Sequence, residues 1–158
     1  MIEKPLTDDA RVLSFTDEWK EFLSEQRVAR IATVNPDGTI HIVPICFVFD
    51  SKSILSTLIK GEKRLANMTK GSRVSIVIDQ YQEKARRWTV LRGVLMYGEV
   101  RVLDYVHHKR QFMRGWRLLI EKYPQYRYWA HGDLTPKDPD RRRIMTFKPD
   151  KIVAWGFS

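Results

Sequence analysis

A series of short apolar runs separated by tight turns constrains the fold of this chain more than any other feature. Near residue 28 the spacing of apolar residues changes from every third or fourth position to every second position, which is the spacing of a strand. The sequence Asn-Pro-Asp-Gly at 35–38 marks a turn between the runs 28–34 and 39–49, and residues 50–53 turn the chain again into 54–59. Strands joined by such short connections pair antiparallel. We therefore expect an antiparallel sheet.

The rest of the chain is expected to supply four more strands and three helices. Thr16 is predicted to cap the first helix, a second short helix covers about 62–69, and a third follows Asp104 and stops at Pro124. The further strands are expected at 73–80, 88–103, 144–147 and 152–157.

Several of these strands are apolar on both faces. The run around the second strand has no clean polar side: Ile40, Ile42, Val43, Ile45, Phe47 and Val48. One face can fill a barrel interior, and the other needs cover from a helix, a second subunit or a flat ligand. Gly93 and Gly98 interrupt the long run 88–103 and predict bends or bulges of the kind that barrel corners need. The predicted fold class is mainly β, a barrel with peripheral helices.

The length and composition indicate one globular domain. The chain has 158 residues, of which 43% are hydrophobic and 30% charged, enough to build a core. We expect a single domain over 1–158, with a loose N-terminal arm at 1–15 and a helix and loop excursion at 104–142. The single cysteine, Cys46, forms no internal disulfide and fits a reducing compartment. With no signal-like or membrane-spanning run, a cytoplasmic protein without membrane contact is expected.

The net charge of +9 raises the question of an anionic partner. Nucleic acid, an anionic membrane face and a polyanionic small molecule are the candidates. The positive charge is spread over four regions of the chain, which is more typical of solubility than of recognition. No RNA-binding signature is present, so nucleic acid is not the expected partner. Lys60–Lys70, Lys84–Arg87, Lys109–Arg117 and Arg141–Arg143 carry most of the excess.

The stretch 56–75 has the composition of a phosphate-binding site. The hydroxyls of Ser56 and Thr57 precede Lys60, and the short helix that follows carries Lys63 and Arg64. Backbone amides at a helix start, cations and hydroxyls together suit a phosphate group. The alternative is an ordinary solvated helix face between two strands.

The order of these motifs resembles the flavin-binding split β-barrels related to pyridoxamine 5′-phosphate oxidase, including the subgroup that uses the deazaflavin F420. The resemblance covers about residues 20–103 and a last strand that carries a tryptophan. It rests on Arg30-Ile31-Ala32-Thr33-Val34, Asp37-Gly38, His41, Val43-Pro44-Ile45, Ser56-Thr57, Gly61, Lys63-Arg64, Asn67, Ser72-Arg73-Val74-Ser75, Gly93 and Gly98-Glu99-Val100.

The resemblance implies an antiparallel split barrel that forms a homodimer, with FMN at the interface between the two subunits. Thr57, Lys63 and Arg64 would then hold the phosphate, with Ser56 and Lys60 close by. The isoalloxazine ring would lie along Val43, Pro44, Ile45 and Cys46, and Trp88 and Trp155 would bound it from the partner chain. The oxidase has arginine then lysine where this chain has Lys63 then Arg64, so the charge is kept and the bidentate fork moves one place.

The function expected from the resemblance is that of an FMN-binding oxidoreductase acting on a small molecule. The residues that hold the vitamin phosphate in the oxidase have no match here, so oxidation of pyridoxamine phosphate is not expected. An F420-dependent reductase and a flavin-binding module without turnover remain alternatives. No side chain is an evident proton donor, so no catalytic residue is assigned, and the flavin itself would carry the electrons.

Two further groups of residues are candidates for a site, namely the possible metal ligands and the aromatic residues near the C-terminus. The four histidines and Cys46 lack the spacing of metal ligands, so no metal site is expected. The aromatic residues of 124–142 belong either to a packed loop or to a lid over the flavin. Stacking of single-stranded nucleic acid is the third interpretation of this loop.

Overall fold

The computed structural model describes residues 14–68, 73–84 and 90–157. In these residues a single antiparallel sheet has seven strands in the order β2-β1-β5-β6-β7-β4-β3. The strands are β1 (Ala29–Val34), β2 (Ile40–Ile45), β3 (Val48–Phe49), β4 (Ile54–Ile59), β5 (Arg73–Tyr81), β6 (Leu91–Leu103) and β7 (Arg142–Trp155). The helices are α1 (Asp17–Glu25), α2 (Lys63–Met68) and α3 (Lys109–Lys122), and two 3₁₀ helices are η1 (Pro124–Trp129) and η2 (Pro139–Arg141).

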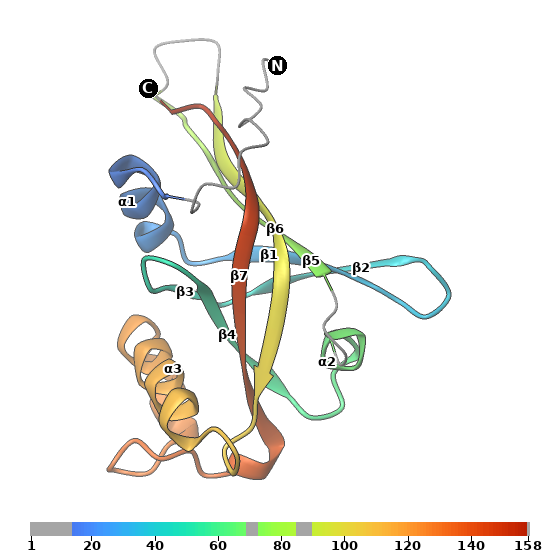
Figure 1. The fold of residues 1–158 in the computed structure, drawn as a ribbon. Helices are drawn as coiled ribbons and strands as arrows, with labels where there is room; N and C mark the ends of the chain where they lie inside the picture. The colour runs from blue at the N-terminus through green and yellow to red at the C-terminus, as the bar shows by residue number, and fades with distance from the viewer. Residues whose placement is uncertain (1–13, 69–72, 85–89, 158) are drawn as a thin grey trace.

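The sheet curls around its own core to form a split barrel, as predicted (Figure 1). Ile31, Ile76, Met96 and Ile152, from four neighbouring strands, are almost completely buried inside the curl. Helix α1 adds Phe22 and Leu23 to the same core. The curl is consistent with the twist of a sheet whose inner face is mainly apolar.

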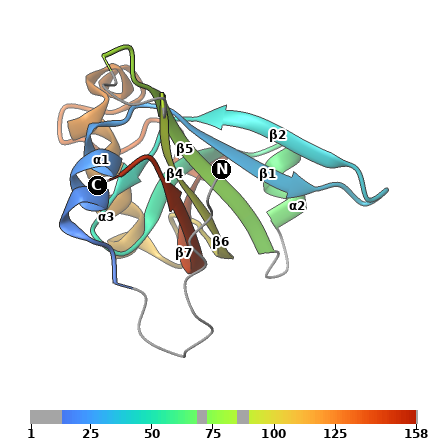
Figure 2. The ribbon, with the colours of Figure 1, turned by 90° about the horizontal axis from the view of Figure 1, so that it is seen from above.

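Helix α1 begins where the sequence predicts it. The Thr16 hydroxyl accepts a hydrogen bond from the Trp19 backbone N–H at 3.2 Å. Asp17 and Glu18 follow in the first turn, where negative charge favours the helix dipole. Figure 2 shows α1 and α3 at one end of the molecule and α2 at the other, close to β1 and β2.

Helix α3 covers the outer face of β4 and builds a second core. Phe112, Trp116 and Leu119 are fully buried there against Leu55 of β4 and Ile144 of β7. Ile54 and Leu58 of the same strand belong to the barrel core instead. The strand is therefore buried on both faces, with the barrel interior on one side and a helix on the other.

The prediction of one continuous second strand over residues 39–49 is wrong. The structure divides it into β2 and β3, with Cys46 and Phe47 between them. The Phe47 N–H donates to the Tyr123 hydroxyl at 3.0 Å rather than to a neighbouring strand. A side chain at the end of α3 thus replaces a strand partner, and the ladder ends.

The two predicted C-terminal strands are a single strand, β7. Lys148–Lys151, predicted as a turn, lie inside it. The register between β6 and β7 shifts next to Gly98, which pairs with Pro149. Because proline has no N–H to donate, a bulge accommodates it within the strand. Of the bends or bulges predicted at the two glycines of this strand, the structure has a register shift next to Gly98.

The predicted start of the third helix at Asp104 is also wrong, because α3 begins at Lys109. The Asp104 carboxylate accepts a hydrogen bond from the His107 backbone N–H at 2.8 Å and so closes a turn before the helix. That bond, with the His107 and His108 rings nearby, lowers the pKa of Asp104 to about 2. The end of the helix before Pro124 is as predicted.

Candidate functional site

A cavity of about 250 Å³ lies where the end of β2, the strand β4, the start of α2 and the 3₁₀ helix η1 meet. One wall comes from the segment that follows β2, one from β4 and α2, and one from η1 and the first residue of β7. The lining residues are Pro44, Ile45, Cys46, Ser56, Thr57, Ile59, Glu62, Arg64, Tyr126, Trp129 and Arg142.

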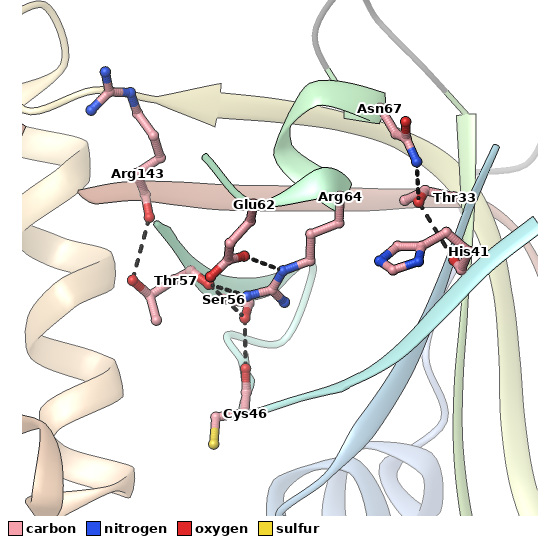
Figure 3. Close-up of polar contacts among 9 residues, drawn as sticks. All are labelled: Thr33, His41, Cys46, Ser56, Thr57, Glu62, Arg64, Asn67 and Arg143. Carbon is pink, nitrogen blue, oxygen red and sulfur yellow. Dashed lines mark hydrogen bonds and ion pairs between the residues drawn. The ribbon is translucent and has the colours of Figure 1, made fainter. Parts of the chain in front are cut away.

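The two hydroxyl residues of β4 are buried in the wall of this cavity. Ser56 is 1% exposed and Thr57 8%. The Ser56 Oγ donates to the Cys46 carbonyl at 2.7 Å and so joins β4 to the break that follows β2 (Figure 3). This bond brings the segment predicted to line a flavin ring next to the pair predicted to hold a phosphate.

Arg64 lies against a carboxylate of its own chain (Figure 3). Its Nε is 2.6 Å from Glu62 Oε2, and its Nη2 donates to the Thr57 carbonyl at 3.1 Å. The Arg64 side chain is only 14% exposed. An anion that binds to Arg64 must therefore share the guanidinium with Glu62 or displace it.

Arg142 reaches the cavity from its third wall. It is 7% exposed and its Nε has no hydrogen-bond partner. The guanidinium carbon lies 5.0 Å from the Trp116 ring centroid and 5.2 Å from that of Trp129, so the cation packs between two indoles. Burial lowers the pKa of Arg142, although Tyr126 and Asp138 favour its charged form.

Tyr126 completes the aromatic wall. Its ring meets Trp116 edge-on at 5.8 Å between centroids and Trp129 at 5.5 Å. Burial and the neighbouring Cys46 raise its pKa well above the usual range, so the phenol stays protonated. Trp129 is 41% exposed and forms the open side of this wall.

Helix α2 is fixed by Asn67, one of the residues that carries the resemblance. Its side-chain amide donates to the Thr33 hydroxyl at 3.0 Å and to Asn35 Oδ1 at 2.9 Å (Figure 3). These bonds connect α2 to the first strand and its hairpin turn. They hold the Glu62–Arg64 segment in place beside β4.

The other predicted site residues lie elsewhere in the subunit or outside the described residues. Lys60 and Lys63 are exposed and do not line the cavity. Val43 packs partly buried against the barrel core. Trp155 is the last residue of β7 and pairs with Gly93 of β6. The cavity residue Arg142 is at the opposite end of the same strand. Trp88 lies outside the described residues.

Sequence reasoning missed Arg142 as a lining residue and left the role of Tyr126 and Trp129 open. The available signal was the alternation of aromatic and basic residues through 124–142. It does not say which members of that segment turn inward, because their positions depend on the packing of α3 against β4 and β7.

The outer face of β1 and β2 is a second notable surface. Val34 is 54% exposed, Ile40 58% and Ile42 61%. Val34 pairs with Ile40, and Ala32 with Ile42, so their side chains share one face of the sheet. A shallow hollow of about 140 Å³ continues this face over β5 and β6 to Tyr97. In the described part of the chain no element covers these residues.

Metal ligation and membrane crossing find no support in the described residues. They contain no group of three or more His, Cys, Asp and Glu side chains arranged to hold a metal ion. None of their helices combines the length and apolar character that a membrane crossing requires.

Together, the curled antiparallel sheet and the cavity beside β4 define a split-barrel protein of the flavin-binding type. The family model described as pyridoxamine 5′-phosphate oxidase matches residues 15–156, and the chain belongs to this family. A search of curated proteins finds no match to the chain.

Solved structures with the same fold have diverse descriptions. A FAD-binding protein from Mesorhizobium loti has a TM-score of 0.65 and 20% identity, over 98% of this chain and 97% of that one. HutZ, a heme storage protein from Vibrio cholerae, has a TM-score of 0.71 and 14% identity, over 92% and 98%. An F420 reductase has a TM-score of 0.62 and 18% identity, over 87% and 98%. At these identities the likeness extends to the fold alone.

Proposed function

We propose that the protein is an oxidoreductase that uses FMN and acts on a small molecule. The observation that carries the proposal is the shared cavity. Pro44, Ile45 and Cys46, predicted to line the ring, meet Thr57 and Arg64, predicted to hold the phosphate. The flavin would supply the transfer of hydride or electrons. The protein would bind it, orient it and shield it from water.

The donors around the cavity fit a flavin phosphate. Arg64 and the hydroxyl of Thr57 would contact the phosphate from within. Lys60 and Lys63 do not line the cavity, but they are exposed next to the lining residues Ile59 and Arg64 in the chain and would add positive charge nearby. Pro44 and Ile45 offer an apolar surface to the ring. The buried hydroxyls are neutral and would orient the phosphate. The cations would balance its charge, which is close to −2 at neutral pH.

The size of the cavity supports a dimeric site. Its volume of about 250 Å³ is below the roughly 300–1,000 Å³ typical of ligand pockets. One subunit would thus hold part of the flavin, and a second copy packed on the uncovered β1–β2 face would complete the site. The homodimer is part of the proposal, as is a cytoplasmic location, for which the free thiol of Cys46 is the argument.

F420 is the second candidate cofactor. The same donors suit any flavin-like ring with a phosphate-bearing tail, and the net charge of +9 favours a long anionic one. A structural neighbour described as an F420 reductase supports this alternative. A flavin-binding module without turnover would use the same site.

The test is to incubate the purified protein with FMN, FAD and F420 and to measure which one it retains after gel filtration. We expect retention of FMN and a visible flavin absorbance band. A protein that retains none of the three contradicts the proposal. Bleaching of the bound flavin by a reductant such as NADPH, followed by recovery with an acceptor, would separate an enzyme from a storage module.

Two variants test the phosphate assignment. Replacing Lys63 and Arg64 together with alanine should abolish FMN retention and leave the fold intact. Glu62→Gln should raise FMN affinity about threefold to tenfold, because it removes the carboxylate that competes for Arg64. Glu121→Gln, exposed on α3, is the matched control. Unchanged retention in the double variant would refute the assignment.

A further inference from the structure

Arg142 is a buried cation that Asp138 favours electrostatically but does not pair with directly in the described residues. It is 7% exposed, and its Nε lacks a hydrogen-bond partner. In the described residues no carboxylate lies within ion-pair distance of it. Buried charges are normally paired, since an unpaired one loses its hydration without compensation.

The residues that line the cavity also carry more positive than negative charge. Arg64 is compensated by Glu62 at 2.6 Å. Arg142 has no such counterpart among the lining residues, where Glu62 is the single carboxylate. The lining residues therefore carry one uncompensated positive charge, and the cavity attracts an anion.

Packing alone does not explain an arginine at this position. Trp116 and Trp129 hold the guanidinium at 5.0 and 5.2 Å from their ring centroids. A methionine or leucine would fill the space between two indoles without leaving a polar atom unsatisfied. What an arginine adds is a fixed set of N–H donors that matches the oxygens of a phosphate or carboxylate.

The aromatic wall indicates the rest of the ligand. Trp116 is fully buried and fixed by a hydrogen bond from its Nε1 to the Leu134 carbonyl at 2.9 Å. Trp129, on the other side of Arg142, is 41% exposed and so offers indole surface to a flat molecule. Tyr126 supports Trp129 from within at 5.5 Å between ring centroids.

We propose that Arg142 is a second anion-binding residue of this cavity, beside Arg64, and takes the phosphate or carboxylate of a flat ligand that stacks on Trp129. This gives the segment 124–142 a role as one wall of the binding site. The proposal rests on the proposed function for the source of the anion, which is either the phosphate of the flavin or an acidic group of the substrate.

Phenyl phosphate tests the site without a flavin, and benzyl alcohol is its neutral control. In a calorimetric titration we expect Arg142→Met to lower the affinity for phenyl phosphate about tenfold or more. Arg141→Met, one residue earlier and exposed, should change it less than about twofold. Benzyl alcohol should not distinguish the variants. Equal losses in the two variants, or no binding of phenyl phosphate to the natural chain, would overturn the proposal.

A measurement on the unaltered protein covers the case in which Arg142→Met does not fold. The Arg142 Nε–H resonance, assigned by its loss in Arg142→Lys, should shift as phenyl phosphate is added. A resonance that does not respond contradicts the proposal.

Flavin titrations separate the two sources of the anion. If Arg142 holds the cofactor phosphate, Arg142→Met lowers the affinity for FMN and leaves that for riboflavin unchanged. If Arg142 instead holds an acidic group of the substrate, Arg142→Met leaves the affinities for FMN and riboflavin unchanged and lowers only the affinity for phenyl phosphate. A natural chain that binds no flavin would remove the proposed function, yet the phenyl phosphate result would stand.

Discussion

Lys122, at the end of α3, places an ammonium group in the interior without a hydrogen-bond partner in the described structure. The Nζ lies 4.0 Å from the Phe47 ring centroid and 5.6 Å from that of Tyr123. Burial, followed by the nearby charge of Arg27, lowers its pKa from 10.5 to about 8. The two rings offset part of the cost of burying the charge.

This pKa predicts a pH-dependent stability. Between pH 8 and 10.5 the unfolded chain binds more protons at Lys122 than the folded chain, so the free energy of unfolding rises with pH. Below pH 8 the buried charge exerts its full cost. Lys122→Met should therefore stabilise the protein by about 1 kcal/mol at pH 7, and this gain should shrink above pH 8.

Urea denaturation at pH 7, 9 and 10 measures the difference between Lys122→Met and the natural chain. Lys52→Met, at an exposed position, controls for the loss of a positive charge. A difference that stays constant over this range, or that grows with pH, would contradict the assignment of the low pKa.

At the same scale, part of the cavity was predictable from the sequence because its residues are close neighbours in the chain. Pro44, Ile45 and Cys46 are consecutive, and Ser56 and Thr57 adjoin each other. The inward position of Arg142 could not be predicted from the sequence, because it depends on the pairing of β7 with β4. That pairing sets Arg142 opposite Ile59, far apart in the chain.

Among the elements, the contact between the end of α3 and the break after β2 depends on one side chain. The Tyr123 hydroxyl accepts from the Phe47 N–H at 3.0 Å. It is also 2.8 Å from the Arg27 carbonyl and 2.9 Å from that of Phe47, to one of which it donates. Burial raises its pKa to about 12, so it keeps its proton.

Tyr123→Phe should therefore lower the free energy of unfolding by about 1–3 kcal/mol, because it leaves a buried backbone N–H without a partner. Urea denaturation measures the change, with the exposed Tyr128→Phe as the control. A loss equal to that of the control would mean that water or a backbone shift replaces the hydroxyl.

The sequence predicted those elements whose ends are set by local contacts. The turn at 35–38 places Val34 opposite Ile40, and Thr16 caps α1. The break after β2 and the continuity of β7 have other causes. The first requires Tyr123 from a distant helix, and the second requires the bulge opposite Gly98. The residues next to the end of β2 do not reveal Tyr123 as a partner, and the residues around Pro149 do not reveal the bulge opposite Gly98.

For the molecule as a whole, the prediction of strands apolar on both faces has two different outcomes. On β3 and β4, α3 supplies the cover, and Val48 and Leu55 are buried beneath it. On β2, Ile40 and Ile42 remain 58% and 61% exposed. Such an uncovered apolar face at a sheet edge is typical of an interface, and it adjoins Pro44 of the cavity.

A dimer formed through this face predicts a linked loss of assembly and cofactor. Ile42→Lys places a charge at the centre of the face and should weaken dimerisation at least about tenfold, since burying an unpaired ammonium is costly. Light scattering after gel filtration measures the change, and FMN retention should fall with it, because in the proposed dimer each subunit would enclose only part of the flavin. Val106→Lys, 71% exposed in the turn before α3, should affect neither quantity. If Ile42→Lys dimerises like the natural chain, the interface lies elsewhere; if it is monomeric but retains FMN fully, one subunit is sufficient to hold the cofactor.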